Sequence, residues 1–168
     1  VLFTFAFGAF VAMPFTGWLI IRNGSRRISL VSVLAYCALI AFVPWMPELA
    51  SLMALYLIMG IATGMQDVSM NAQAVLVERE YQRPIMTSFH AFFSIGMAIG
   101  AWCGALFSDL DIGLRQHLLL ISVVSLAMVA WVSRNLVEDK PESSDEGGPF
   151  LRMPNRAMLG IGVIAFCC

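Results

Sequence analysis

Residues 1–27 read VLFTFAFGAFVAMPFTGWLIIRNGSRR, an apolar run followed at once by three arginines in six residues. A helix of about 20 apolar residues can cross the hydrocarbon core of a bilayer, which is roughly 30 Å thick. Residues 1–21 hold no charged side chain, so they predict a transmembrane helix that ends at a polar turn. No basic segment precedes the run and no cleavage site follows it, which argues against a signal peptide.

The same pattern recurs along the chain. The helices that we expect cover residues 1–21, 28–46, 49–77, 85–107 and 117–133, and a further one begins at 157 and is cut off at 168. The chain is 60% apolar and 12% charged, with a mean hydropathy of +0.82. Soluble domains are roughly 45–50% apolar and 25% charged. The surplus of apolar surface needs lipid, so the sequence predicts an all-α, polytopic bundle of transmembrane helices in a lipid bilayer.

The basic residues orient this bundle. Nine of the ten lie on one side of the predicted membrane: Arg22, Arg26, Arg27, Arg79, Arg83, Arg134, Lys140, Arg152 and Arg156. Only Arg115 lies on the other side. Because loops rich in Lys and Arg stay in the cytoplasm, we expect residues 22–27, 78–84 and 134–156 to be cytoplasmic. The expected location is the inner (plasma) membrane of a bacterium.

Residues 134–156, RNLVEDKPESSDEGGPFLRMPNR, differ from the rest of the chain. They are rich in charge and hold three prolines, so they end the helical pattern. We interpret them as a cytoplasmic linker between two bundles. Residues 1–133 would form part of the first bundle, and residues 157–168 would begin the second. Because the chain starts and stops inside apolar runs, we expect it to be an internal fragment of a longer protein.

Asp67 is the residue of greatest interest inside the membrane. It lies 11 residues before Glu78, or roughly 16 Å at 1.5 Å per residue, which places it near the bilayer midplane. A charge there costs about 2.5–3.5 kcal/mol on insertion scales. The side chain must therefore face the bundle or a water-filled cavity, or be protonated. A carboxyl that binds and releases a proton at this depth would serve a carrier driven by a proton gradient.

Other polar side chains are expected near Asp67. Asn71 lies one helical turn after Asp67, and Gln66 directly precedes Asp67 in the sequence. If the next helix is antiparallel, His90 lies at the depth of Asn71 and Ser94 near that of Asp67. These residues are candidates to line one cavity for a small-molecule solute. The alternatives stay open that Asp67 is a structural acid, and that the others form ordinary hydrogen bonds between helices.

Glycines mark where helices are expected to pack closely. Gly60 and Gly64 are four residues apart, and Gly96, Gly100 and Gly104 repeat the same spacing. Small residues in such rows let two helix backbones approach each other in a membrane.

Several function classes lack their signals in this sequence. A net charge of −1 supplies no basic face for nucleic acid. The four cysteines fall in apolar runs without metal-ligand or redox spacing. No HExxH or GxSxG motif occurs. We therefore expect neither an enzyme nor a protein that holds a metal or organic cofactor.

The turn after the first expected helix, GWLIIRNGSR at residues 17–26, resembles the signature G-x-L-A-D-R-x-G-R-R of the major facilitator superfamily (MFS). The positions that match are Gly17, Leu19, Arg22, Gly24 and Arg26. Ile21 stands where the family has an aspartate that helps to latch the cytoplasmic gate, and Ser25 replaces an arginine.

The resemblance implies a fold and a register. The chain would span about helices 2 to 7 of an MFS transporter, that is, the N-terminal half without its first helix and the start of the C-terminal half. The linker would join the two halves, so the C-terminal half of the same polypeptide would be the partner of this bundle. Gly17, Arg22, Gly24 and Arg26 would form the cytoplasmic gate loop.

A finer resemblance lies in the third and fourth expected helices. Residues 64–72, GMQDVSMNA, and 88–96, SFHAFFSIG, are similar to segments of the fucose:proton symporter-like sugar permeases. This implies that Asp67 is the proton-coupling acid and that the solute is a sugar or related metabolite, carried by symport. A drug or metabolite exporter of the same fold, or a non-transporting membrane sensor, are the alternatives.

Overall fold

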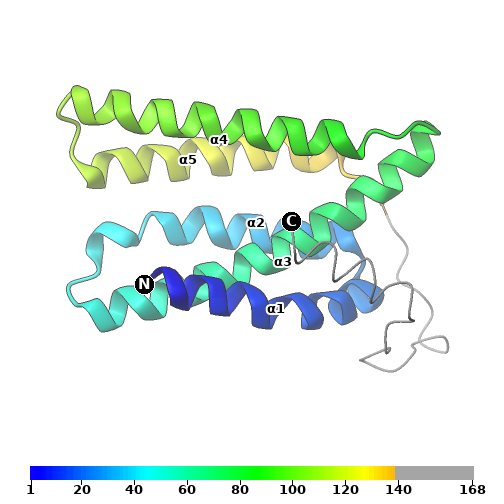
Figure 1. Ribbon diagram of the computed structural model, residues 1–168, viewed down its shortest axis with the longest axis horizontal. Helices are drawn as coiled ribbons and strands as arrows, with labels where there is room; N and C mark the ends of the chain where they lie inside the picture. The colour runs from blue at the N-terminus through cyan, green and yellow to red at the C-terminus, as the bar shows by residue number, and fades with distance from the viewer. Residues whose placement is uncertain (139–168) are drawn as a thin grey trace, which may run out of the picture.

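The computed structural model describes residues 1–138, which form a bundle of α-helices joined by short turns (Figure 1). The elements are α1 (Leu2–Asn23), α2 (Ser25–Ile40), η1 (Val43–Trp45), α3 (Leu49–Tyr81), α4 (Met86–Asp109), α5 (Leu114–Val132) and η2 (Ser133–Asn135), where η denotes a short 3-10 helix. No strand occurs among these residues. The predicted all-α fold is therefore confirmed for residues 1–138. Most of the expected linker and the helix expected from residue 157 lie outside the described residues.

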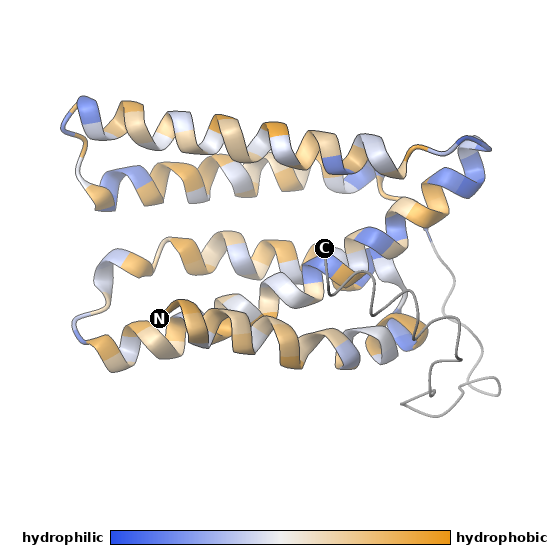
Figure 2. Ribbon diagram, viewed as in Figure 1, coloured by the Kyte–Doolittle hydropathy of each residue, from blue (hydrophilic) through white to orange (hydrophobic). Residues whose placement is uncertain are grey.

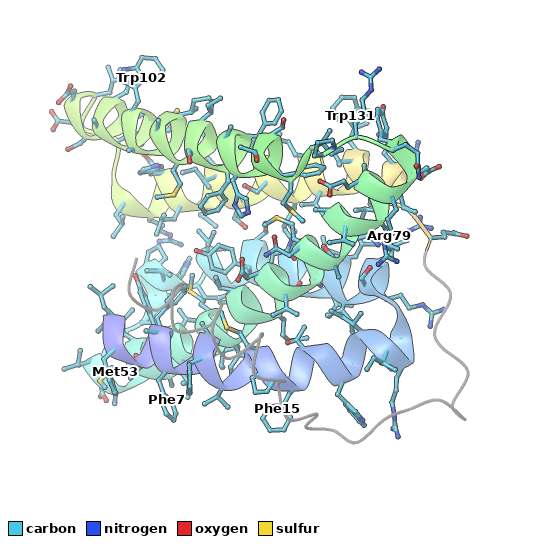
Figure 3. All side chains as sticks on the ribbon, turned by 45° about the vertical axis from the view of Figure 1, so that its right-hand side comes forward. Phe7, Phe15, Met53, Arg79, Trp102 and Trp131 are labelled. Carbon is cyan, nitrogen blue, oxygen red and sulfur yellow. The ribbon has the colours of Figure 1, made fainter. Side chains whose placement is uncertain are left out.

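Within residues 1–138, four helical stretches are long and apolar enough to cross a membrane. They are Leu2–Asn23, Leu49–Tyr81, Met86–Asp109 and Leu114–Asn135. Apolar residues run along these helices, and polar ones gather at the turns and in the second half of α3 (Figure 2). Large aromatic side chains point outward, among them Phe7, Trp102 and Trp131 (Figure 3). This outward apolar surface is that of an integral membrane protein.

The second expected helix is shorter than its apolar run. α2 begins at Ser25 and ends at Ile40, so its 16 residues span only about 24 Å. Pro44 explains the end, because a proline ring in a helix collides with the carbonyl four residues earlier, here that of Ile40. The chain instead turns through η1 before α3 begins.

α3 is the longest element. Its 33 residues span about 50 Å, more than a bilayer core needs, and it continues past the expected end at residue 77 to Tyr81. The Glu78 carboxylate accepts hydrogen bonds from the amides of Ile85 and Met86, each at 2.9 Å. The end of α3 therefore caps the start of α4.

α1 and α3 pack backbone against backbone. A side chain at Gly60 would overlap the carbonyl of Phe5, and one at Gly64 would overlap that of Ala9. Gly8 of α1 is equally close to the backbone of α3 at Leu57. The close contact predicted from Gly60 and Gly64 is thus confirmed, and its partner is α1.

The glycines of α4 behave differently. A side chain at Gly96 or Gly100 would meet nothing within 4 Å among the described residues, and one at Gly104 would meet only the His117 ring, at 3.9 Å. α4 has no buried residue within residues 1–138. It lies beside α5, apart from the layer of α1 and α3 (Figure 1).

α2 connects the two layers. It packs against α3 on one side and α5 on the other. The buried Ser122 hydroxyl of α5 donates a 2.6 Å hydrogen bond to the Cys37 carbonyl of α2. This bond holds the two helices together in the half of the bundle that is predicted to be extracytoplasmic.

Candidate functional site

The second half of α3 carries Asp67 and Asn71 side by side. Asn71 Nδ2 donates a hydrogen bond to the Asp67 carbonyl at 2.8 Å and approaches the Asp67 carboxylate at 3.4 Å. The Asp67 side chain is exposed. No basic side chain among residues 1–138 forms an ion pair with it. The carboxylate therefore keeps most of its hydrogen-bonding capacity for other partners.

The position of this acid follows from a helical row on α3. Gly60, Gly64, Asp67 and Asn71 are spaced by four, three and four residues, which puts them on one face of the helix. α1 covers the two glycines. Farther along, α3 diverges from α1 toward α4 (Figure 1). Asp67 thus lies where this face of α3 leaves the cover of α1.

Gln66 points to a different neighbour. Its Oε1 accepts a 2.7 Å hydrogen bond from the Ser32 hydroxyl of α2, and its Nε2 donates a weaker one to Ser29 Oγ at 3.3 Å. Both of its polar ends are therefore engaged between α2 and α3. The structure places Gln66 in a helix interface rather than beside the Asp67 carboxylate.

His90 and Ser94 lie on α4, and both are exposed. Ser94 Oγ donates a 3.1 Å hydrogen bond to the His90 carbonyl within the same helix. Within residues 1–138 no hydrogen bond joins either residue to Asp67 or Asn71. The structure thus brings together two of the five predicted site residues and leaves the shared cavity a prediction.

The predicted gate loop contains a one-residue turn, Gly24, between α1 and α2. Gly24 has a φ of 80°, in the region that favours glycine. Its amide donates to the Ile20 carbonyl at 2.8 Å, so it also closes the end of α1. A side chain at Gly17, by contrast, would meet nothing within 4 Å among the described residues.

The two arginines of this loop have separate partners. The Arg22 guanidinium lies 4.3 Å from the centre of the Trp18 ring, a cation–π contact one turn back along α1. Arg26 forms an ion pair with Glu138, just after η2. The loop is therefore bonded to the chain that leaves α5.

A second bond joins the same segments. Gln73 of α3 is buried, and its Nε2 donates to Ser25 Oγ at 2.7 Å and to the Val137 carbonyl at 3.1 Å. Gln73 thus links the start of α2, the end of α3 and the chain after η2.

Two matching rows of polar residues in the sequence indicate this contact between α2 and α3. Ser25, Ser29 and Ser32 fall on one face of α2, and Gln66, Ser69 and Gln73 fall on one face of α3. Polar rows of this kind in apolar helices indicate hydrogen bonding between helices. The rows could have been read from the sequence as an α2–α3 interface.

Comparison with known proteins agrees with this architecture. The family profile described as Major Facilitator Superfamily matches residues 1–168. An uncharacterized MFS-type transporter of Yersinia pestis is 32% identical over 161 residues, covering 95% of this chain and 41% of the relative. An uncharacterized transporter of Sinorhizobium fredii is 27% identical, covering 94% of this chain and 42% of its own length. Membrane protein MosC of Rhizobium meliloti is 26% identical, and the match covers 96% of this chain and 39% of MosC.

No solved structure matches the chain. The chain spans about two fifths of the length of the curated relatives that it matches. The family profile nonetheless covers its whole length, and the described residues form the helical membrane bundle that such a match requires. The chain belongs to the major facilitator superfamily.

Proposed function

We propose that the full-length protein is a secondary active transporter that moves a small solute by alternating access between its two halves, coupled to protons. The observation that carries this proposal is the uncovered Asp67 carboxylate on a membrane-spanning helix. An intramembrane acid is costly unless it faces a cavity or a partner. Transporters place such residues at the interface of their repeats, near the midplane.

The local geometry suits a proton carrier. Asn71 Nδ2 bonds the Asp67 carbonyl at 2.8 Å and makes only a weak contact of 3.4 Å with the Asp67 carboxylate, which leaves the carboxylate available to a proton. α1 leaves this face of α3 open, so the C-terminal half of the polypeptide supplies its opposite wall. Protonation there removes a charge from the membrane and favours closure around it.

The solute site is proposed to include Asn71, His90 and Ser94, with Gln66 behind them. α4 has no buried residue within residues 1–138, so His90 and Ser94 are open to segments beyond the described chain. The proposed solute is a sugar or related metabolite, and the proposed location is the inner membrane of a bacterium. Because a symporter moves its solute in the same direction as the proton, a proton gradient directed into the cell would drive the solute inward.

The test uses the full-length protein in proteoliposomes with a panel of labelled sugars and metabolites. Asp67→Asn is expected to abolish accumulation driven by a proton gradient while solute exchange at equal concentrations continues, because exchange needs no net proton movement. Asp111→Asn is the matched control, since Asp111 lies in the turn between α4 and α5. Unchanged gradient-driven accumulation in Asp67→Asn would overturn the role of Asp67.

The direction of transport needs its own measurement. Solute added to right-side-out and to everted vesicles, with a pH-sensitive dye inside, reports whether protons move with the solute or against it. Co-movement supports symport. Opposite movement identifies an exporter of the same fold.

A further inference from the structure

α2, α5 and Gln66 of α3 line an open pocket in the half of the bundle that is predicted to be cytoplasmic. α2 and α5 are joined in the other half by the Ser122–Cys37 hydrogen bond. Beyond that bond they leave a pocket of about 290 Å³. Its apolar lining consists of Leu30, Val33, Met128, Val129, Val132 and Leu136, and its polar lining of Ser29, Gln66 and Ser133.

The polar groups of the pocket do not call for a polar ligand. Gln66 is bonded at both ends to Ser32 and Ser29. Ser133 Oγ donates to the Ala130 carbonyl at 2.8 Å. With these groups satisfied, the walls favour an apolar occupant.

The volume of the pocket and its access from the surface indicate which kind of apolar ligand it can hold. Sites for drug-sized ligands measure roughly 300–1,000 Å³, so 290 Å³ suits a segment of hydrocarbon chain. Met128 is 58% exposed and Val132 is 45% exposed, so the pocket is reached across apolar surface. In a membrane protein the apolar molecule that reaches such a surface is lipid.

The charge at one end of the pocket selects among lipids. Arg134 directly follows Ser133, is exposed, and forms no ion pair within residues 1–138. Arg26 lies one turn before the pocket residue Leu30 on α2 and is bonded to Glu138. Basic pockets between transmembrane helices on the cytoplasmic side bind anionic headgroups. An anionic lipid would place its phosphate at Arg134.

We infer that this α2–α5 pocket binds an acyl chain of an anionic phospholipid from the cytoplasmic leaflet, with the headgroup at Arg134. The pocket meets α3 at Gln66, about 100° around the helix from Asp67, and lipid binding there is a property separate from solute transport. Its test reads lipid binding rather than solute movement, so its failure and that of the proposed function are distinguishable.

The experiment measures the melting temperature, Tm, of delipidated full-length protein with phosphatidylglycerol or phosphatidylcholine. Phosphatidylglycerol is expected to raise Tm more than phosphatidylcholine does. Val129→Trp, which fills the pocket, should reduce the phosphatidylglycerol effect at least twofold. Arg134→Gln should reduce it to the phosphatidylcholine level. Glycerol phosphate, a headgroup without acyl chains, should have no effect, and a full effect from it would overturn the acyl-chain site.

Two matched variants serve as controls, one for added bulk and one for a lost charge. Val124→Trp adds the same bulk to an exposed position of α5 outside the pocket, and Arg83→Gln removes a cytoplasmic charge elsewhere. Both should keep the full lipid effect. If Val129→Trp does not fold, Met128→Trp fills the pocket from its exposed side, and Arg134→Gln tests the headgroup independently. An unchanged phosphatidylglycerol effect in the filled variants, or equal effects of the two lipids on the wild type, refutes the site.

Discussion

Gln73 Nε2 lies 2.7 Å from Ser25 Oγ in a buried hydrogen bond that ties the second half of α3 to the first residue of α2. The same amide nitrogen reaches the Val137 carbonyl at 3.1 Å. Three segments far apart in sequence thus meet at one side chain. The predicted gate loop and the beginning of the expected linker are held to α3 through this side chain.

Replacing Gln73 by Met is expected to lower the stability of the full-length protein. The change removes the Gln73 donor from Ser25 Oγ and from the Val137 carbonyl, and a hydrogen bond inside a protein typically contributes about 0.5–1.5 kcal/mol. Thermal unfolding in detergent measures the loss. Gln82→Met, at an exposed turn, is the control. In a double-mutant cycle with Ser25→Ala, strictly additive effects would contradict the bond.

Gly60→Val is expected to disrupt the contact of α1 with α3. The added side chain would collide with the Phe5 carbonyl, and backbone cannot move aside as a flexible side chain can. Overpacking typically lowers the free energy of unfolding by about 1–3 kcal/mol, and we expect the loss from Gly60→Val to lie at or above the upper end of that range. The yield and Tm of folded protein report the effect. Gly113→Val, at an exposed position of the α4–α5 turn where a side chain meets nothing within 4 Å among residues 1–138, serves as the comparison, and equal losses would argue against the α1–α3 contact.

Ser122→Ala is expected to weaken the attachment of α5 to α2. It removes the donor to the Cys37 carbonyl, and side-chain hydrogen bonds inside membranes average about 0.6 kcal/mol. A small but reproducible drop in Tm should result. Ser133→Ala, whose hydroxyl bonds within its own turn, should change Tm less. A larger drop in Ser133→Ala than in Ser122→Ala would contradict the assignment.

Glu138→Gln is expected to have little effect on stability. The Glu138 side chain is 83% exposed, and its partner Arg26 is 28% exposed. Ion pairs in water contribute about 0–1 kcal/mol and are weakened by salt. The Tm difference from wild type should stay small at low salt and vanish at about 1 M salt, where the Debye length is about 3 Å. A large, salt-independent loss would show that the contact is more than a surface ion pair.

The predicted orientation is testable with single cysteines in the full-length protein. After the natural cysteines have been replaced, Asn23→Cys should react with an impermeant maleimide only from the cytoplasmic side, because the arginines hold that turn inside. Asp111→Cys should react only from the other side. Labelling of both positions from one side would reverse or refute the topology.

The helices were largely predictable because crossing a bilayer requires long apolar runs. Hydropathy locates the part of a helix that lies in lipid, but not the part that extends past it. α3 therefore runs on through Arg79 to Tyr81, beyond the apolar segment. α2 is shorter than its apolar run because Pro44 ends it for reasons of backbone geometry.

The site was predictable only where one helix sets the geometry. Asp67 and Asn71 are one turn apart, so their contact follows from helical spacing alone. The expected meeting with His90 and Ser94 depended also on how α4 is rotated and how near it lies to α3. Depth along the membrane can be counted from sequence, but rotation depends on packing against other helices.

The Glu78 carboxylate gives the α3–α4 turn an advantage during biosynthesis. The amides of Ile85 and Met86 are already bonded by an acid that the ribosome delivers only a few residues earlier. α3 and α4 can therefore leave the translocon as a hairpin whose turn is complete before α5 exists. α4, which has no fully buried residue within residues 1–138, can then stay in lipid until its neighbours are made, with these two amides at its start already bonded.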